Sequence, residues 1–163
     1  MSLEMKELLA TFAHPGTVQW IGLRPERRAD ILEVGEVLAD PSTGLEGDRF
    51  SGKPAAKRQV TLIQHEHLAV MAQLLGREEI DPALLRRNIV VSGINLQALK
   101  QRNFKIGSAT LYGTGNCAPC SRMEETLGTG GYNAMRGHGG ITAYVVDAGK
   151  ISVGDSVVPE GYR

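Results

Sequence analysis

Apolar residues along this chain occur in short runs that are separated by polar or glycine-containing turns. Residues 4–12 predict a short amphipathic N-terminal helix, because their apolar positions recur at helical spacing. These positions are Met5, Leu8, Leu9 and Phe12. Runs rich in valine, isoleucine and leucine predict strands at 17–23 and 31–39, with a polar, mostly basic loop at 24–28 between them.

The middle of the chain predicts a strand at 59–63 that leads directly into a helix. The apolar positions of that helix repeat at i, i+3, i+4 and i+7, and Gly76 suits its C-terminal end. These positions are Leu68, Met71, Ala72 and Leu75. Asp81 followed by Pro82 is typical of a helix start, and the short helix that it begins gives way to a strand at 88–91.

The last third of the chain is rich in glycine. Twenty glycines make up about one residue in eight, against an average of ~7%. They concentrate after residue 105, where short β-branched runs alternate with them, which indicates many short strands joined by tight turns. Segments 104–109 and 151–156 both place an aliphatic-glycine-polar turn before an apolar strand, as adjacent strands of a barrel would. The sequence predicts one mostly β domain (α+β by content) over residues 1–163.

Bulk composition narrows the classes of function. The formal net charge is +0, with 18 basic and 18 acidic side chains, so a general nucleic-acid surface is not expected. No stretch approaches the ~20 apolar residues that span a bilayer, and no membrane association is expected. The first residues lack the features of a secretory signal, so we expect a cytoplasmic protein whose two cysteines are reduced thiols.

The most informative local motif is Cys117-Ala118-Pro119-Cys120. A thiolate is a strong nucleophile and a soft metal ligand, so two cysteines in a proline-containing turn suggest chemistry. A structural alternative is a pair of small buried apolar residues. A thioredoxin-type redox pair is another, with a strand at 109–112 before it and a helix start at 121–127 after it. A structural zinc site would need scattered ligands such as His14 and His138, because no second CxxC pair is present.

Several further motifs, taken together and in order, resemble the MOSC domain family, which is named for the C-terminus of molybdenum cofactor sulfurase. The resemblance extends from about Val18 to Pro159 and is specific as a set. It rests on GLEGDR at 44–49, RQVTLI at 58–63, RRNIVVSG at 86–93, CAPCSRMEE at 117–125, LGTGGYN at 127–133, RGHGGI at 136–141 and GKISVGDSV at 149–157.

The resemblance implies a MOSC-like β-barrel with a few short helices. In relatives similar to the mitochondrial amidoxime-reducing component, one cysteine coordinates molybdenum held by molybdopterin, and Cys120 matches that position better than Cys117. It therefore implies a molybdenum-cofactor protein that reduces small N-oxygenated substrates with electrons from a separate electron-donor protein. The alternative is a sulfur carrier, which receives sulfur as a Cys120 persulfide from a pyridoxal-phosphate-dependent cysteine desulfurase.

A molybdopterin site needs basic side chains and backbone N–H groups for the phosphate and the pterin. The cofactor-binding residues expected from the motifs are Arg49, Lys53, Arg58, Arg86, Arg87, Asn88, Arg122, Arg136 and His138. Other basic residues of these loops are Arg24, Arg27, Arg28 and Lys57. For each residue alone, an ordinary solvated basic face is the alternative.

Two further expectations concern neighbouring residues. Arg86 and Arg87 directly precede a strand, where successive side chains point in opposite directions, so we expect one of the two to reach the site. Cys117 is expected either to be buried or to form a regulatory disulfide with Cys120.

Overall fold

The computed structural model describes residues 4–50 and 52–162. Its strands are β1 (Gly16–Leu23), β2 (Leu32–Val34), β3 (Glu36–Asp40), β4 (Gly44–Leu45), β5 (Val60–Gln64), β6 (Ile89–Ser92), β7 (Asn103–Ile106), β8 (Ala109–Asn116), β9 (Ile141–Asp147), β10 (Gly149–Ser152) and β11 (Ser156–Pro159). Its helices are α1 (Met5–Leu9), α2 (His65–Leu74), α3 (Arg122–Leu127) and α4 (Gly131–Met135), with 3-10 turns η1 (Pro82–Leu85) and η2 (Leu96–Leu99).

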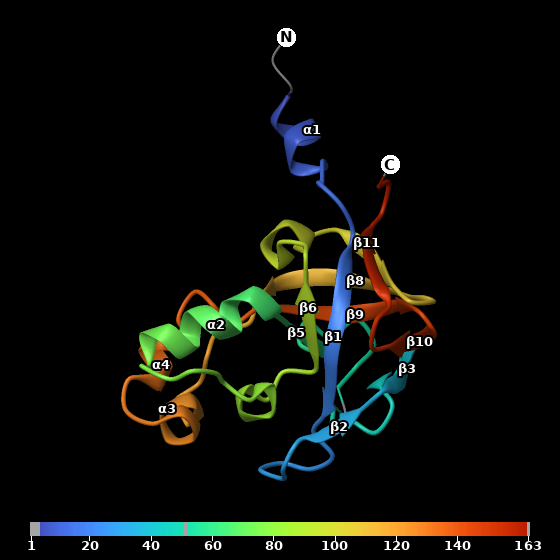
Figure 1. Ribbon diagram of the computed structural model, residues 1–163. Helices are drawn as coiled ribbons and strands as arrows, with labels where there is room; N and C mark the ends of the chain where they lie inside the picture. The colour runs from blue at the N-terminus through green and yellow to red at the C-terminus, as the bar shows by residue number, and fades with distance from the viewer. Residues whose placement is uncertain (1–3, 51, 163) are drawn as a thin grey trace.

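Seven strands close into a barrel, which confirms the predicted mostly β architecture (Figure 1). Their order is β11-β7-β8-β9-β5-β6-β1, and pairing of β11 with β1 completes the ring. The β5–β6 pair is parallel and is connected through α2 and η1, as a parallel pair requires a crossover. Strands β10, β3 and β4 form a separate small sheet.

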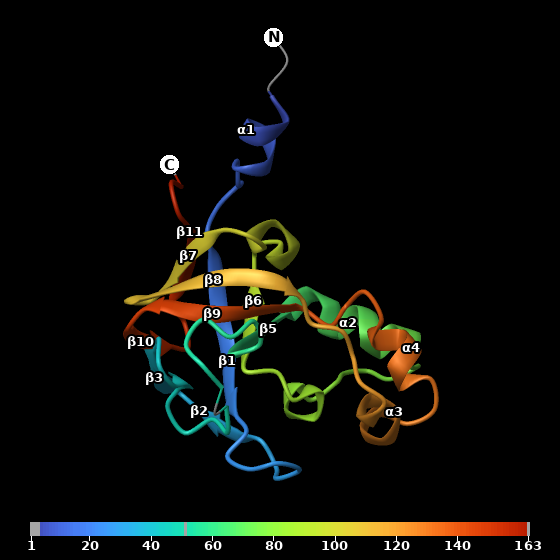
Figure 2. The same cartoon turned by 180° about the vertical axis from the view of Figure 1, so that it is seen from behind.

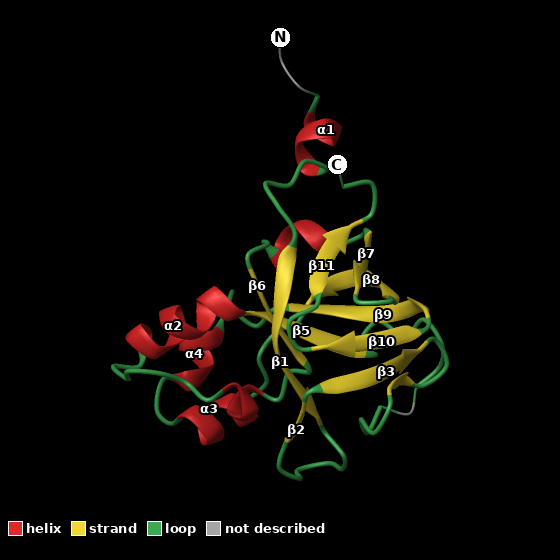
Figure 3. Cartoon of the chain, turned by 45° about the vertical axis from the view of Figure 1, so that its right-hand side comes forward, coloured by secondary structure: helices red, strands yellow, loops and turns green. Residues whose placement is uncertain are grey.

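Two apolar clusters hold the fold together. One fills the barrel and includes Val60 and Leu62, whereas the other lies between the barrel wall and the helices and includes Ile63. Helices α2, α3 and α4 gather on one side of the barrel (Figure 3). Because β5 is covered on both faces, all its residues are buried, including the polar Thr61 and Gln64, and apolar residues do not simply alternate with exposed polar ones.

The structure modifies two of the predicted elements. The predicted strand at 31–39 is two strands, since β2 pairs with β1 and, after Gly35, β3 pairs with β10 of the small sheet. The predicted helix at 4–12 is confirmed over the shorter range of α1, but none of its residues is buried. Phe12, just beyond it, packs on the barrel core with Arg102 over its ring.

Other local predictions are confirmed. The helix at α2 buries Met71 and Ala72, and Gly76 follows it with a φ of +67°. Asp81 caps η1 by accepting a hydrogen bond from the Ala83 N–H at 3.0 Å. The two similar glycine turns do precede strands, β8 and β11, but the expectation that these strands are adjacent is wrong, because β7 lies between them in the barrel. Within the described residues, no helix has the length and apolarity to cross a membrane.

Candidate functional site

The two cysteines lie in a loop, residues 117–121, that connects the end of β8 to the start of α3 (Figure 2). Cys117 is buried and Cys120 is exposed, so Cys120 is the thiol that a reactant or cofactor can reach. The N–H of Cys117 donates to the carbonyl of Gly140 at 2.9 Å, and the Cys120 carbonyl accepts from the N–H of Met123 at 3.0 Å. We call residues 117–121 the cysteine loop.

Arg87 holds the cysteine loop from inside the protein. It is only 7% exposed, and its guanidinium donates to the carbonyls of Cys117 at 3.2 Å and Ala118 at 3.3 Å. The same group donates to the carbonyls of Gly139 at 2.8 Å and Leu85 at 3.3 Å. Burial lowers the pKa of the Arg87 guanidinium. A buried positive charge with four carbonyl acceptors therefore joins the cysteine loop to the segment before β9.

Glycines permit the close approach of these two segments. A Cβ atom at Gly139 would lie 2.1 Å from the carbonyl oxygen of Cys117, which is closer than any real Cβ contact. Gly140 has a φ of +87°, and a Cβ there would lie 1.8 Å from the carbonyl oxygen of Leu62 in β5. Two glycines of the 136–141 motif, Gly139 and Gly140, thus serve backbone packing around the cysteine loop.

Arg86 takes a different direction from Arg87, as expected for neighbouring residues. Its backbone is left-handed, with a φ of +57°, directly after η1. One guanidinium nitrogen, Nη1, donates to the carbonyl of Ala29 at 2.6 Å, while Nη2 is buried and has no hydrogen-bond partner among the described residues. Nη2 is therefore a donor that a bound anion could satisfy.

Positive charge exceeds negative charge around Arg86. Burial lowers the pKa of Arg86, and the positive charges of three other arginines lower it further, whereas Asp48 raises it. Those arginines are Arg122, Arg24 and Arg49. We call Arg86 and these three arginines the arginine cluster. Asp48 forms an ion pair with Arg24 at 3.0 Å, so the cluster keeps a net positive charge.

A buried polar network supports the arginine cluster. Asn88 is completely buried, and its amide donates to the carbonyl of Gly22 at 3.0 Å and to Asp48 Oδ1 at 3.1 Å. Its carbonyl oxygen accepts from the N–H of Thr61 at 3.0 Å. Asn88 thus joins β1, β5 and the 46–50 loop, and it can act on a ligand only through the residues that it holds.

The other expected residues differ in their surroundings. Arg58 approaches the buried thiol, with Nη2 3.6 Å from Cys117 Sγ. Arg136 lines a cavity of about 520 Å³ together with Cys117, Ala118 and Pro119 of the cysteine loop. Lys53 is exposed, and no hydrogen bond or ion pair joins its side chain to another described residue. Sequence reasoning missed Asp48 and Gly139, although both lie inside the quoted motifs.

His138 lies beside His67 of α2. Their ring centroids are 5.0 Å apart in an edge-to-face arrangement, and His138 Nδ1 lies 3.0 Å from the carbonyl of Ala134. Burial lowers the pKa of His67 below its usual value of 6.5, the charge of His138 lowers it further, and Glu66 raises it. His138 therefore contacts α2 through His67, and it lies next in sequence to Gly139, which supports the cysteine loop.

The lowered pKa of His67 predicts an acid-sensitive contribution to stability. The unfolded chain takes up a proton at His67 more readily than the folded chain, so stability present above about pH 6.5 is lost as the pH falls through that value. We expect the urea midpoint to fall between pH 7.5 and pH 5.5, and to fall less in His67→Gln. His65→Gln, on the exposed start of the same helix, is the control and should behave as the wild type. An unchanged pH dependence in His67→Gln would contradict the assignment.

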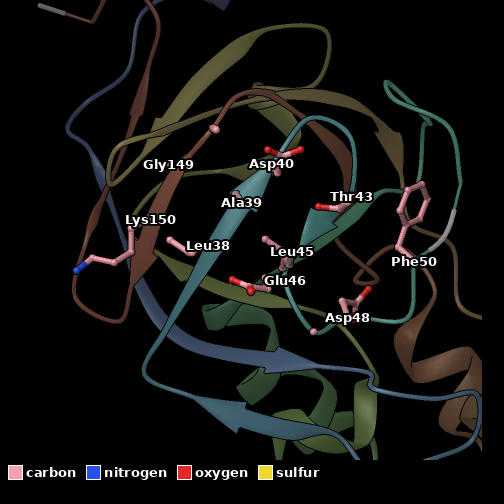
Figure 4. A pocket seen from close by; sticks show the side chains of 12 residues that line it. Leu38, Ala39, Asp40, Thr43, Leu45, Glu46, Asp48, Phe50, Gly149 and Lys150 are labelled. Atoms are coloured by element: carbon pink, nitrogen blue, oxygen red, sulfur yellow. The ribbon is translucent and has the colours of Figure 1, made fainter.

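A larger cavity than the one beside the cysteine loop lies elsewhere, along the small sheet (Figure 4). It measures about 840 Å³, with Leu38 and Leu45 among its apolar walls, Phe50 at one end and the carboxylates of Asp40 and Glu46 at its edge. It contains neither cysteine. Its acidic edge does not suit an anionic ligand, whereas the arginine cluster does.

The surroundings of the two cysteines argue against a zinc site and against a buried apolar pair. Within residues 4–50 and 52–162, no three His, Cys, Asp or Glu side chains are grouped to hold a metal ion by themselves, so the zinc alternative lacks a ligand set. Cys117 is buried, as one expectation had it, but Cys120 is exposed, so the two are not a buried apolar pair. A metal brought by a cofactor needs only one exposed protein thiolate, and Cys120 provides one.

Comparison with known proteins gives the family. The family model of the MOSC domain matches residues 46–158, which is more than half of the chain. A search of curated proteins gives no match. Among solved structures, the YuaD protein from Bacillus subtilis is 20% identical with a TM-score of 0.75, covering 90% of this chain and 97% of its own. YiiM from Geobacillus stearothermophilus is 16% identical with a TM-score of 0.72, covering 89% and 75%, respectively.

YiiM from Escherichia coli is also similar in structure, at 18% identity and a TM-score of 0.66, covering 90% of this chain and 71% of its own. At these identities the structural likeness concerns the fold, and it extends over about nine-tenths of this chain. The residues that match the family model include Cys120. The chain therefore belongs to the MOSC domain family.

Proposed function

We propose that this protein binds a molybdenum cofactor through the thiolate of Cys120 and reduces small N-oxygenated molecules with electrons from a separate donor protein. The observation that carries the proposal is the pairing of an exposed thiol with unmatched positive charge in a domain of this family. The cysteine loop presents Cys120, and Arg122 of the arginine cluster follows it two residues later.

The described residues fit such a cofactor. Among the strongest charge influences on Arg86, three are arginines and one is a carboxylate, Asp48, and Arg86 Nη2 is a buried donor without an acceptor among the described residues. Both features suit a phosphate, which provides several charged acceptor oxygens. When bound, the cofactor would supply a metal that can accept an oxygen atom from the substrate. Arg86, Arg49 and Arg122 would neutralise its phosphate.

The remaining residues hold the site in position. Arg87, through its four carbonyl acceptors, fixes the backbone of the cysteine loop, and Gly139 and Gly140 allow the neighbouring segment to support it. Cys117 lies inside this packing and is not exposed to a ligand. A cytoplasmic location, where thiols stay reduced, would keep Cys120 available.

Replacing Cys120 by alanine tests the proposal. After expression in a host that makes the mature cofactor, we expect near-stoichiometric molybdenum and pterin in the wild type. Molybdenum should fall by more than about tenfold in Cys120→Ala, because the protein ligand to the metal is lost. Cys117→Ala, which removes the buried thiol, is the matched control and should keep its metal. Metal-free wild type from a host whose other molybdoenzymes are loaded would contradict the proposal.

The exposure of Cys120 also favours a second candidate function. A thiol at the surface can reach the active site of a partner enzyme, as a sulfur carrier must. In that case incubation with a cysteine desulfurase should add one sulfur atom to Cys120, detected by mass spectrometry. The same treatment should leave Cys120→Ala unchanged, and the protein should carry no stoichiometric molybdenum.

A further inference from the structure

The cavity beside the cysteine loop has a distinct composition. It is lined by residues 117–119 and by the glycines at 137, 139 and 140, and its polar and aromatic lining residues are Gln97, Asn116, Tyr132 and Arg136. At about 520 Å³ it has room for a small organic molecule. A molecule bound there would contact the turn that ends in Cys120.

Positive charge surrounds this cavity. Arg136 is the one charged side chain among the described residues that line it, and its guanidinium bonds only to Asn133 Oδ1, at 3.5 Å. Behind the wall, the buried Arg87 donates to the carbonyls of Cys117, Ala118 and Gly139, all of which are lining residues. No carboxylate from the described part of the chain lines the cavity, although that of Glu124 accepts from the backbone N–H of the lining residue Tyr132 at 3.0 Å. The charge of the lining side chains is positive and therefore favours an anion.

Lys100 adds to this charge from the strand side. Its ammonium group donates to Asn116 Oδ1 at 3.2 Å, so it lies next to a lining residue and leaves the amide nitrogen of Asn116 free for a ligand. Gln97 provides a second carboxamide. Hydrogen-bond donors from amides and a guanidinium are the groups that bind a carboxylate.

An aromatic face completes the cavity. Tyr132 of α4 is 38% exposed and lines the cavity next to Arg136. The backbone at Tyr132 is held by Glu124, whose carboxylate accepts from the N–H groups of Gly130 at 2.8 Å and Tyr132 at 3.0 Å. An exposed aromatic ring at the wall of a cavity is suited to stack on a planar molecule.

We propose that this cavity binds planar organic anions, in which an aromatic ring lies on Tyr132 and a carboxylate is paired with Arg136. Arg136 is then the residue that selects charge, and the substrates of the enzyme are N-oxygenated aromatic compounds that carry a carboxylate. The identification of the ligand as substrate rests on the proposed function, whereas its binding to the cavity does not.

Binding to the metal-free protein tests the proposal with three ring probes of similar shape: benzoate, benzamide and benzylamine. We expect benzoate to bind about tenfold more tightly than benzamide, because a charge-assisted pair replaces a neutral one, and benzylamine not to bind. Backbone amide NMR shifts of Gly137, Gly139 and Gly140 should move with benzoate. In Arg136→Gln, the dissociation constant of benzoate should rise about tenfold and that of benzamide should not.

Two controls separate the outcomes. Lys105→Gln removes a positive charge on β7. Lys105 pairs with Thr110 at the start of β8, whereas the cysteine loop follows the other end of that strand, so this variant should bind benzoate as the wild type does. Inorganic phosphate carries charge but no ring and should compete poorly. Equal binding of benzoate and benzamide, unchanged benzoate binding in Arg136→Gln, or phosphate binding as tightly as benzoate would overturn the proposal. Benzoate binding by a protein that takes up no molybdenum would refute the proposed function and leave the anion cavity standing.

Discussion

Replacing Gly140 by alanine should destabilise the folded protein by about 3 kcal/mol or more, because the new Cβ cannot be accommodated. It would lie 1.8 Å from the carbonyl oxygen of Leu62 and 2.9 Å from the Cα atom of Ile63, and both belong to the fully buried strand β5. The backbone of β5 is paired with β9 on one side and β6 on the other, so its atoms cannot move aside independently of these strands. The free energy of unfolding in urea measures the loss.

Gly137→Ala is a matched control for the backbone conformation. Gly137 has a φ of +80°, close to the +87° of Gly140, but a Cβ there would meet no atom within 4 Å. Its replacement should therefore cost only about 1–2 kcal/mol, the penalty of a left-handed residue. A similar loss in both variants would show that conformation alone, and not packing on β5, requires Gly140.

Replacing Gly140 by alanine should also disturb the cysteine loop. The carbonyl of Gly140 accepts the hydrogen bond from the N–H of Cys117, so a shift of residue 140 removes a support of the loop. Cys117 is 1% exposed in the wild type, and its alkylation should be slow there. We expect it to become faster in Gly140→Ala under conditions where the protein remains folded, while Gly137→Ala keeps Cys117 protected.

Replacing Asn88 by alanine should cost about 3 kcal/mol, because it leaves several buried polar groups without partners. The N–H of Thr61 and the carbonyl of Gly22 both lose a bond to the Asn88 amide, and Asp48 Oδ1 loses one of its donors. All of these lie at the end of the barrel that carries the arginine cluster. Urea unfolding measures the effect.

Asn95→Ala is the matched control for this substitution. Asn95 is exposed and caps η2 by accepting from the N–H of Gln97 at 3.1 Å. Loss of such a cap costs about 1 kcal/mol. If Asn88→Ala were no more destabilising than Asn95→Ala, the buried network would not be a principal support of this end of the barrel.

Local pattern predicted much of the fold. The apolar spacing of α2, the Asp81-Pro82 start of η1 and the glycine turns before β8 and β11 each depend on residues close in sequence, and each is confirmed. The break at Gly35 was not predicted, because a single glycine inside an apolar run does not by itself end a strand. Its two halves separate since they pair with strands from different parts of the chain, β1 and β10.

Exposure of α1 could not be predicted from its periodicity either. Met5, Leu8 and Leu9 are spaced as in a helix that packs on a core, yet they are 67%, 48% and 62% exposed, respectively. Helical spacing indicates that one face of the helix is apolar. It does not predict whether another element of the same chain packs against that face.

The sequence by itself determined the short strands, their turns and, through the order of its motifs, membership in the MOSC family. Which of the basic residues meet, and how, was decided by the tertiary structure. Arg86 and Arg87 are adjacent, but the left-handed backbone at Arg86 directs them apart, one towards the arginine cluster and the other beneath the cysteine loop. The carbonyls that Arg87 binds come from residues 85, 117, 118 and 139, and only closure of the barrel brings such distant segments around one guanidinium.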